Sequence, residues 1–135
     1  HKMVAENSGL LSVAAAQKLD FLKGKRVVCV ISGGNMDVIT MSSVIQNGLI
    51  LRDRVFTISV LLPDRPGQLA EITKVIAEQK GNVIKLEHNQ FVSVNRNLAV
   101  ELRVTMEAFG TEHKHQIIEE LRKNGFDPQV VDAKL

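Results

Sequence analysis

The stretch LAVELRVTME, residues 98–107, decides the fold of the second half of the chain. From Leu98 to Met106 every second side chain is large and apolar, and the side chains between them are small or polar. A period of two is that of a β-strand with one face on a core and the other in water. The sequence therefore predicts a strand with one dry and one wet face at this position.

Three more strands are predicted around this one. Residues 55–61 and 82–90 are rich in β-branched and apolar side chains, and a turn region at residues 93–97 separates the second of them from residues 98–107. A last strand begins at Val130-Val131, shortly before the end of the sequence. These strands alternate with helical patterns, so the second half contains a complete set of elements.

Two helices are predicted between these strands. The first follows a breaker at residues 63–67 and stops at Gly81, and its buried face consists of Leu69, Ile72, Val75 and Ile76. The second has Thr111 as its N-cap, ends at Gly125 and buries Ile117, Ile118 and Leu121. With right-handed crossovers, the order βαββαβ predicts an α+β domain of ferredoxin-like topology, with both helices on one face of a four-stranded antiparallel sheet.

Residues 4–51 are organised differently. A small-residue helix around residues 13–16 fades at residues 23–25, and an unbroken apolar run at residues 27–31 predicts a strand buried on both faces in a parallel sheet. A second helix is predicted from about Met36 to Asn47, with Gly48 as its stop. A lone strand between two helices is not an independent domain, so we expect these residues to belong to a larger α/β domain. The charged break at residues 52–54 divides the chain into domains 1–52 and 53–135.

The composition excludes several classes of function. The net charge of +2 is small, the basic residues are scattered, and Trp and Tyr are absent, so nucleic acid is not an expected partner. No apolar run is long enough to span a membrane. The single Cys29 excludes an intrachain disulfide and is typical of a cytoplasmic protein. No convergent set of ligands predicts a metal site, because His113 and His115 point to different faces of their helix.

The turn Ser32-Gly33-Gly34-Asn35 joins the predicted buried strand to the helix that follows it. Free backbone N–H groups and the positive end of a helix dipole lie at such a place, and the glycines let a ligand approach the backbone. Taken alone, the pattern is more typical of a tight turn that Asn35 caps. Ser32 adds a hydroxyl that can donate or accept a hydrogen bond.

Residues 28–37 and 42–49 closely resemble the end of the catalytic domain of pyridoxal-phosphate-dependent threonine dehydratases, which are fold type II enzymes. Residues 6–9 resemble a glutamate-and-glycine turn of the same family. The resemblance implies that Ser32 hydrogen-bonds the pyridine nitrogen of the cofactor, and that the cofactor-binding residues are Ser32, Gly33, Gly34 and Asn35. No lysine matches the Schiff-base motif and no segment matches the phosphate loop, so we expect this chain to be catalytically inactive and to hold no cofactor by itself.

The motif LPDRPGQL, residues 62–69, resembles the loop-to-helix motif of ACT domains, which bind free amino acids. Pro66 fixes φ in the first helical turn, Gly67 lets a ligand come close, and the helix N-terminus can receive a carboxylate. Gly81-Asn82-Val83 resembles the second half of the ACT site, where an amide side chain grips the amino acid. The implied effector-binding residues are Asp64, Arg65, Pro66, Gly67, Gln68, Leu69, Asn82 and Val83.

The resemblance implies that the chain is the C-terminal part of a threonine dehydratase, in which the catalytic segment is followed by a regulatory ACT domain. Such an enzyme deaminates L-threonine to 2-oxobutyrate and ammonia, and the effector would be isoleucine or valine, products of the isoleucine biosynthesis route. ACT sites are commonly built between subunits, which implies a homo-oligomer: an ACT-mediated dimer, or a tetramer in the parent enzyme.

Three alternatives remain from the residues alone. The 62–69 motif is also compatible with a turn that binds nothing, in a module that only dimerises. An RNA-binding domain of the same topology would need aromatic platforms on its strands, and these are missing. An acylphosphatase-like catalyst would need a phosphate-binding loop, for which Arg65 is the one available arginine.

Overall fold

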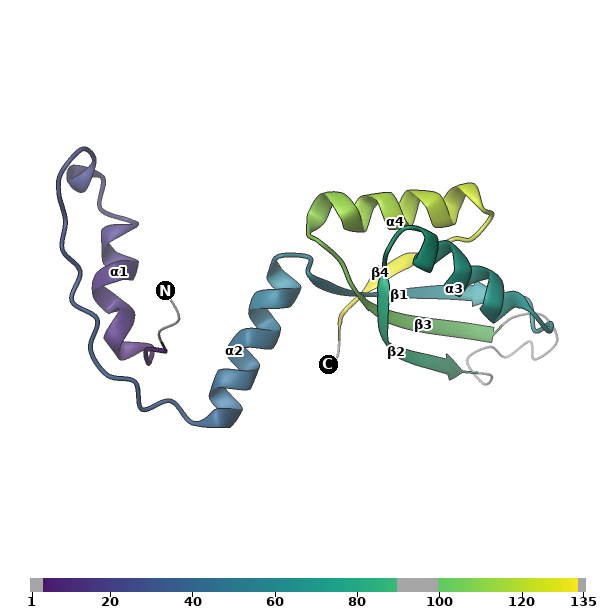
Figure 1. The fold of residues 1–135 in the computed structure, drawn as a ribbon, viewed down its shortest axis with the longest axis horizontal. Coiled ribbons are helices and arrows are strands. Elements are labelled where there is room, and N and C mark those ends of the chain that lie inside the picture. Colours follow the sequence, from purple (N-terminus) through teal and green to yellow (C-terminus); the bar gives the residue numbers. More distant parts are fainter. Residues whose placement is uncertain (1–3, 90–99, 134–135) are drawn as a thin grey trace. The chain divides into compact units, whose positions relative to one another are not determined.

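The computed structural model describes residues 4–89 and 100–133, and the chain divides into two compact units between Ile45 and Gln46 (Figure 1). The first unit holds the short helices η1 (Ser8–Leu10), α1 (Leu11–Ala16) and η2 (Asp20–Leu22). Helix α2 (Val38–Leu51) contains the division point. In the described part of the chain, no helix has the length and apolar character needed to cross a bilayer.

The second unit has the predicted βαββαβ order. Its elements are β1 (Val55–Leu62), α3 (Gln68–Glu78), β2 (Asn82–Asn89), β3 (Val100–Glu107), α4 (Thr111–Lys123) and β4 (Gln129–Val131). The sheet order is β2-β3-β1-β4 and every neighbouring pair is antiparallel. Figure 1 shows α3 and α4 on the same face of this sheet, which confirms the ferredoxin-like α+β fold. The predicted turn at residues 93–97, together with Gln90, Leu98 and Ala99, lies outside the described residues.

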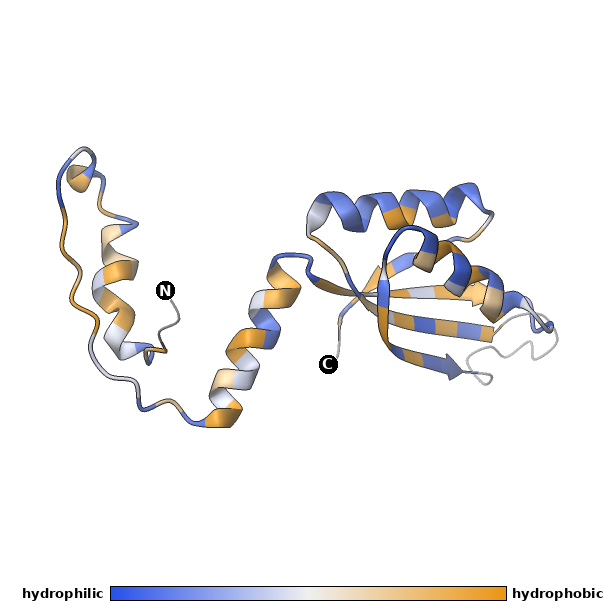
Figure 2. Cartoon of the chain, viewed as in Figure 1, coloured by the Kyte–Doolittle hydropathy of each residue, from blue (hydrophilic) through white to orange (hydrophobic). Residues whose placement is uncertain are grey.

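The core lies between the sheet and the two helices. Ile58 of β1 is paired with Val104 of β3, and both side chains are fully buried. Figure 2 shows the alternation of hydrophobic and hydrophilic residues along β3 that defines this face. The predicted helical stripes are confirmed by the buried residues Ile72, Val75, Ile76, Ile117, Ile118 and Leu121. Leu69 is an exception, because it is 41% exposed and does not join the core.

The face of the sheet away from α3 and α4 is less exposed to solvent than the alternation along β3 predicts. Thr105 and Glu101 are buried, because β3 lies between β2 and β1 and the neighbouring side chains cover it. The hydroxyls of Thr57 and Thr105 are 2.8 Å apart, and Ser59 Oγ donates a hydrogen bond to Glu101 Oε1 at 2.6 Å. The Ser59 bond and the Arg103 guanidinium hold the pKa of Glu101 below its usual value. The charge of Glu101 is thus tolerated because Ser59 and Arg103 both donate hydrogen bonds to it.

Helices α2, α3 and α4 all end in the same backbone motif, in which a left-handed residue follows the last turn. The left-handed residue is Asp53 (φ 51°) after α2, Lys80 (φ 62°) after α3 and Gly125 (φ 86°) after α4. After α2, for instance, Arg54 N donates to Leu49 O and Asp53 N donates to Ile50 O, the pattern of a Schellman motif. The predicted end of α4 at Gly125 is confirmed. Gly81, the predicted end of α3, lies one residue beyond Lys80, the left-handed residue.

The helix predicted from about Met36 to Asn47 has Gly48 as its expected stop. This prediction is wrong, because α2 continues through this glycine to Leu51. A glycine inside a helix only weakens it, and the helix ends where Asp53 closes the motif. The prediction of Thr111 as the N-cap of the next helix is also wrong. Gly110 occupies the cap position of α4, and the Thr111 hydroxyl donates instead to Asp53 Oδ2 at 2.8 Å.

The strand predicted at residues 27–31 is also wrong, because the segment belongs to no strand and Val28 is 91% exposed. A strand needs a partner, and the described part of the first unit offers none. The segment is held beside α1 by two side-chain bonds, from Ser12 Oγ to Val30 O at 2.7 Å and from Cys29 Sγ to Ser12 O at 3.7 Å. The apolar side chains of residues 27–31 are therefore largely exposed to solvent, although their sequence predicts burial.

The chain enters and leaves the four-stranded sheet at the same end. β1 begins there at Val55, and β4 runs antiparallel to β1, with Gln129 opposite Ser59 and Val131 opposite Thr57. The chain therefore enters the sheet at Val55 and leaves it, after Val131, toward the same end.

Candidate functional site

The loop between β1 and α3 borders a hollow at one end of the sheet. The hollow has a volume of about 350 Å³ and is open to solvent. It is lined by the whole predicted segment from Asp64 to Leu69, together with Leu62, His88 and Val100. The structure therefore brings most of the predicted effector residues together with an apolar floor.

The backbone of this loop leaves the start of α3 accessible. Arg65 N donates to Pro63 O at 2.8 Å, which tightens the turn, and Gly67 has a left-handed φ of 96°. No heavy atom lies within 4 Å of the position that a Cβ on Gly67 would occupy. No side chain caps this helix N-terminus in the described part of the chain. N–H groups of the first turn are therefore available to an anion.

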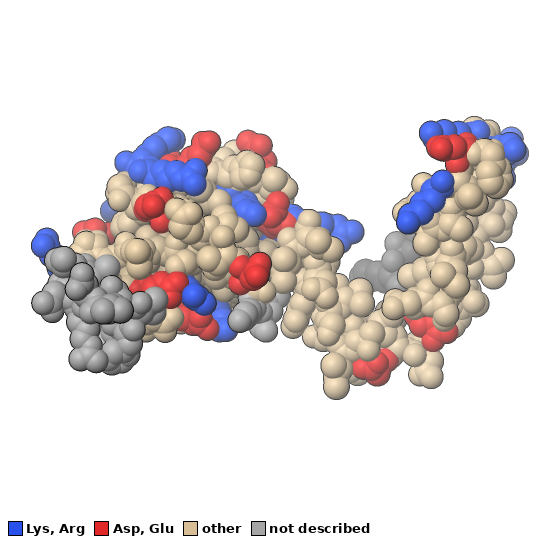
Figure 3. All heavy atoms as spheres, turned by 180° about the vertical axis from the view of Figure 1, so that it is seen from behind, with Lys and Arg blue, Asp and Glu red and all other residues tan. Residues whose placement is uncertain are grey.

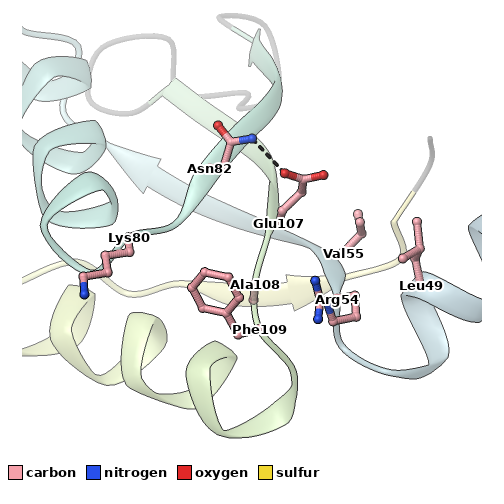
Figure 4. A pocket seen from close by; sticks show the side chains of 8 residues that line it. All are labelled: Leu49, Arg54, Val55, Lys80, Asn82, Glu107, Ala108 and Phe109. Atoms are coloured by element: carbon pink, nitrogen blue, oxygen red, sulfur yellow. Dashed lines mark hydrogen bonds between the residues drawn. The ribbon is translucent and has the colours of Figure 1, made fainter.

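Asn82 and Val83 lie at the start of β2, and Asn82 lines a second hollow of about 150 Å³ (Figure 4). Asn82 Nδ2 donates to Glu107 Oε2 at 2.8 Å, and these residues face each other across β2 and β3. Val83 instead packs against the core. The rest of the lining consists of Leu49, Arg54, Val55, Lys80, Ala108 and Phe109.

The two hollows lie at opposite ends of the sheet. Asn82 is paired with Glu107, and Glu107 is paired with Val55 at the beginning of β1. The loop follows Leu62, at the other end of the same strand. Since each strand residue advances about 3.3 Å, the two ends are roughly 23 Å apart. One copy of the chain therefore does not bring the two halves of the predicted effector site together.

Asp53 connects the chain just before β1 to the first turn of α4. Lys114 Nζ lies 2.7 Å from Asp53 Oδ1, and the Lys114 and Asp53 side chains are 17% and 24% exposed. The hydrogen bonds from Lys114 and Thr111 hold the pKa of the Asp53 carboxyl below its usual value. Sequence reasoning missed this contact, because residues 52–54 were read as a break between domains. One signal could have identified this contact. Asp53 is a charged residue at the end of a helix that no glycine terminates.

His113 links the ends of both helices. Its Nδ1 accepts a hydrogen bond from Phe109 N at 3.0 Å, and its Nε2 lies 2.6 Å from Gln79 O. The ring also stacks on Phe109, with 4.9 Å between the centroids. His113 thus has a structural, hydrogen-bonded role. Within residues 4–89 and 100–133, no three His, Cys, Asp or Glu side chains converge on a point that could hold a metal ion.

The turn from Ser32 to Asn35 lies in the first unit, beside the turn that begins at Glu6. Glu6 N donates to Gly33 O at 3.2 Å, and Ser32 N donates to Gly9 O at 3.4 Å. A Cβ on Gly9 would collide with the backbone of Ser32, so the close approach requires glycine there. The structure therefore joins two segments that the sequence only suggested separately.

The start of α2 is capped by a residue that sequence reasoning did not select. Asp37 Oδ1 accepts from Thr40 N at 2.8 Å, and the Asp37 carboxylate also accepts from the Thr40 hydroxyl. These bonds hold the pKa of Asp37 below its usual value. The alternative in which Asn35 caps the helix is wrong, because Asp37 immediately precedes α2 and has the capping geometry.

The surface of the second unit carries mixed charges. Figure 3 shows positive and negative side chains interspersed on the face that it presents. Helix α2, in contrast, contains no charged residue, and Val38, Ile39 and Leu51 are each more than three-quarters exposed, at 79%, 79% and 84%. A helix of this composition is typical of a buried position in a larger protein.

Comparison with known proteins gives a consistent result. Residues 56–126 match the family model of the ACT domain. The chain is 35% identical over 131 residues to an L-threonine ammonia-lyase of Thermotoga maritima, covering 96% of this chain and 32% of that protein. It is 35% identical over 127 residues to an L-threonine ammonia-lyase of Geobacter sulfurreducens, covering 93% of this chain and 31% of that protein.

Other matches extend this group. The chain is 32% identical over 130 residues to an L-threonine dehydratase biosynthetic IlvA of Staphylococcus aureus, covering 93% of this chain and 29% of that protein. The chain thus spans about a third of the length of these curated relatives. Among solved structures, an unknown protein from Galdieria sulphuraria matches with a TM-score of 0.44 and 15% identity, covering 98% of this chain and 70% of that chain.

Proposed function

The chain belongs to the ACT domain family, and we propose that it is the amino-acid-binding regulatory region of a threonine dehydratase. Such an enzyme deaminates L-threonine to 2-oxobutyrate and ammonia. The accessible N-terminus of α3, opened by Gly67 at the loop hollow, is the observation that carries this proposal. Sequence similarity to threonine ammonia-lyases over nearly the whole chain supports the identity of the parent enzyme.

The loop hollow suits an aliphatic amino acid. The N–H groups at the start of α3 and the positive end of its dipole would receive the α-carboxylate. Leu62, Leu69 and Val100 offer apolar surface to a hydrocarbon side chain. We therefore propose isoleucine or valine as the effector.

A second copy of the chain would complete the site. Strand β2 forms an edge of the sheet and presents Ile84 and Leu86, which are 44% and 38% exposed. Antiparallel pairing of β2 with its copy, with Leu86 opposite Leu86, would place Lys85 opposite Glu87 twice. This self-complementary arrangement is what a two-fold interface requires.

The same pairing would bring the two halves of the effector site to the same end of the combined sheet. Asn82 of one copy would lie at the Asn89 end of the other copy, on the sheet face opposite the one from which His88 lines the loop hollow. We therefore propose an ACT-mediated dimer with two composite sites, which a parent enzyme could combine into a tetramer. An effector would shift the enzyme between two states by binding one dimer arrangement more tightly than another.

We propose that residues 1–52 are the end of the catalytic domain and that residues 53–135 are the ACT domain. The glycine turns at Gly9 and Gly33 and the exposed Ser32 fit one corner of a pyridoxal phosphate site, where the Ser32 hydroxyl would hold the ring nitrogen. When bound, that cofactor supplies the electron sink for the elimination. The exposed apolar side chains of α2 fit the same assignment, because packing within a larger catalytic domain would bury them.

Isothermal titration calorimetry of the whole chain with L-isoleucine, L-valine, L-threonine and L-serine tests the sensor proposal. We expect saturable heat with an aliphatic amino acid and its loss in Gly67→Ala, because the new methyl group would occupy the approach to the helix N-terminus. Gly125→Ala is the matched control, since Gly125 also has a left-handed φ and open space around it but does not line the hollow.

A second function, assembly without ligand binding, is favoured by the exposed β2 edge. Analytical ultracentrifugation separates the two functions when it is combined with the titrations. A folded dimer that gives no heat with any of the four amino acids would leave assembly as the function of the domain. A monomer that gives no heat would oppose both functions.

A further inference from the structure

We propose that His113 is a proton-sensitive latch: its neutral imidazole ring holds the turn between β3 and α4, and protonation of the ring releases this turn. The latch consists of the His113 ring and two backbone groups, the N–H of Phe109 in the turn and the carbonyl of Gln79 at the C-terminal end of α3. Its operation does not depend on the binding of an amino acid, so it is a property of the domain beyond the proposed function.

The two hydrogen bonds of His113 define which ring nitrogen carries the proton. The backbone N–H of Phe109 is a donor, so the Nδ1 atom of His113, 3.0 Å away, must be an acceptor. The carbonyl of Gln79 is an acceptor, so the Nε2 atom, 2.6 Å away, must be a donor. Only the neutral ring with its proton on Nε2 satisfies both backbone groups. The backbone on the two sides of the ring therefore selects one tautomer.

Protonation of the ring breaks one of these bonds and leaves the other intact. A protonated imidazole donates from both of its nitrogens and accepts at neither. The bond to Gln79 O can then persist, whereas a new N–H at Nδ1 would point at the N–H of Phe109. The Phe109 backbone therefore loses its acceptor and moves away from the ring. Histidine is the side chain that ordinarily changes its charge between about pH 5 and pH 8, so this is the range in which we expect the release.

The charged side chains near His113 are of both signs. Among the described residues, they are Glu78 and Lys80 at the C-terminal end of α3, Glu112 on α4, and Arg54 before β1. The first three line the same open hollow as His113, and the guanidinium of the fourth lies 6.0 Å from the centre of the Phe109 ring. Two carboxylates thus face two cations, so the backbone bonds, rather than a net local charge, distinguish the two forms of the ring.

The latch controls the position of an exposed aromatic side chain. Phe109 is 70% exposed, and its ring stacks on the imidazole of His113 with 4.9 Å between the centroids. Phe109 lines the hollow of about 150 Å³ beside Asn82 (Figure 4), and also an open hollow of about 460 Å³ between the ends of α3 and α4. Release of the Phe109 backbone would therefore change both hollows, at the end of the sheet where the chain enters β1.

Nuclear magnetic resonance of the whole chain between about pH 5 and pH 8 tests the latch. At the alkaline end, long-range ¹H–¹⁵N spectra should show the His113 ring with its proton on Nε2 and none on Nδ1. As the pH falls, the Phe109 amide resonance should move together with the ring nitrogens of His113. Hydrogen exchange of this amide, corrected for the intrinsic effect of pH, should become about fivefold faster, the size of one net hydrogen bond. A proton on Nδ1 at the alkaline end, or a Phe109 amide that does not follow the ring, would overturn the proposal.

Two variants separate the two contacts of His113. The short amide of His113→Asn can replace Nδ1 as the acceptor for the Phe109 N–H but does not reach Gln79. The longer amide of His113→Gln can replace Nε2 at Gln79 and leaves Phe109 without an acceptor. The Phe109 amide should thus exchange slowly over the whole pH range in His113→Asn and rapidly over the whole range in His113→Gln. A pH response that persists in both variants would refute the role of His113.

His115→Gln is the matched control, because His115 lies two residues further along α4, is exposed and does not line the hollow at Phe109. The pH response of the Phe109 amide should be unchanged in this variant, and its loss would assign the response to His115 instead. Circular dichroism verifies that each variant folds. If a His113 variant does not fold, the tautomer and the Phe109 response of the wild type decide the proposal.

Discussion

The two ends of the sheet differ in how firmly their side chains are held. At the Asn82 end, side-chain hydrogen bonds connect Asn82 with Glu107, Asp53 with Lys114, and His113 with Gln79. At the loop end, Asp64 and Arg65 are exposed, and a backbone bond from Arg65 N to Pro63 O maintains the turn. One half of the proposed site is thus organised before a ligand arrives, whereas the other half can adjust to it. Organised contacts reduce the entropy cost of binding.

Gly81→Ala should give the largest loss of stability. Gly81 directly precedes Asn82, so the change affects the end of the sheet whose side chains are firmly held. A Cβ on Gly81 would lie 2.7 Å from Ile76 Cγ2 and 3.2 Å from Ile76 O, inside the packed core. Overpacking of this kind costs about 2 kcal/mol. Chemical denaturation followed by circular dichroism measures the free energy of unfolding.

Gly67→Ala is the comparison at the loop end. Its Cβ would meet no atom, so the cost should be limited to the left-handed backbone, about 1 kcal/mol. A loss at Gly67 equal to or larger than that at Gly81 would contradict the view that the loop end is the loosely held one.

Asp53→Asn should have the next largest effect, a loss of about 1.5 kcal/mol at neutral pH, because a hydrogen bond to a charged partner is weakened. Asn tolerates the left-handed backbone of this position, so the change removes mainly the charge. Calorimetric melting at pH 7 measures the loss, and Glu119→Gln is the surface control.

The pH dependence sharpens the test at Asp53. Lys114 and Thr111 lower the folded-state pKa of Asp53, so the folded protein holds the ionised carboxylate more strongly than the unfolded chain does. This stabilisation is complete above the unfolded pKa, about 3.9, and is lost as the pH falls through the lower folded value. Asp53→Asn should therefore flatten the acid limb below about pH 5. Parallel acid limbs for the two proteins would exclude the contribution of this ion pair.

Lys80→Gly should give the smallest change, a gain of about 1 kcal/mol. A side chain in the left-handed region is strained, and glycine removes this strain at the end of α3. Gly125→Lys, at the equivalent position after α4, should cost a similar amount. Urea denaturation of both variants tests this reciprocity, and a loss of stability in Lys80→Gly would show that the Lys80 side chain makes a contact worth more than the strain.

The sequence predicted the parts of the fold that depend on periodicity. The alternation in residues 100–107 and the stripe at Ile117 and Leu121 predicted β3 and α4, because burial on one face leaves a regular pattern. The helix ends were harder to predict, since Asp53 and Lys80 form turns for which glycine is the usual signal. The apolar run at Val27–Ile31 was misjudged, because a strand depends on partners that a local pattern does not reveal.

The candidate site was predictable only in part. The loop motif at residues 62–69 identified the lining of one hollow, since the motif is continuous in sequence. Glu107 was not identified, because its role depends on its register opposite Asn82, 25 residues away. The need for a second copy follows from the antiparallel pairing, which separates Asn82 from the loop.

The position of the chain's two connections has a consequence for how this domain combines with others. The strand beginning at Val55 and the strand ending at Val131 are attached to the rest of a chain at the same end of the sheet, and the loop at Gly67 lies at the far end. A domain attached in this way can be added to an enzyme, or duplicated in tandem, without threading the chain past its ligand loop. Fusion to another chain at this end would involve the junction around Asp53 and would leave the loop at Gly67 unobstructed.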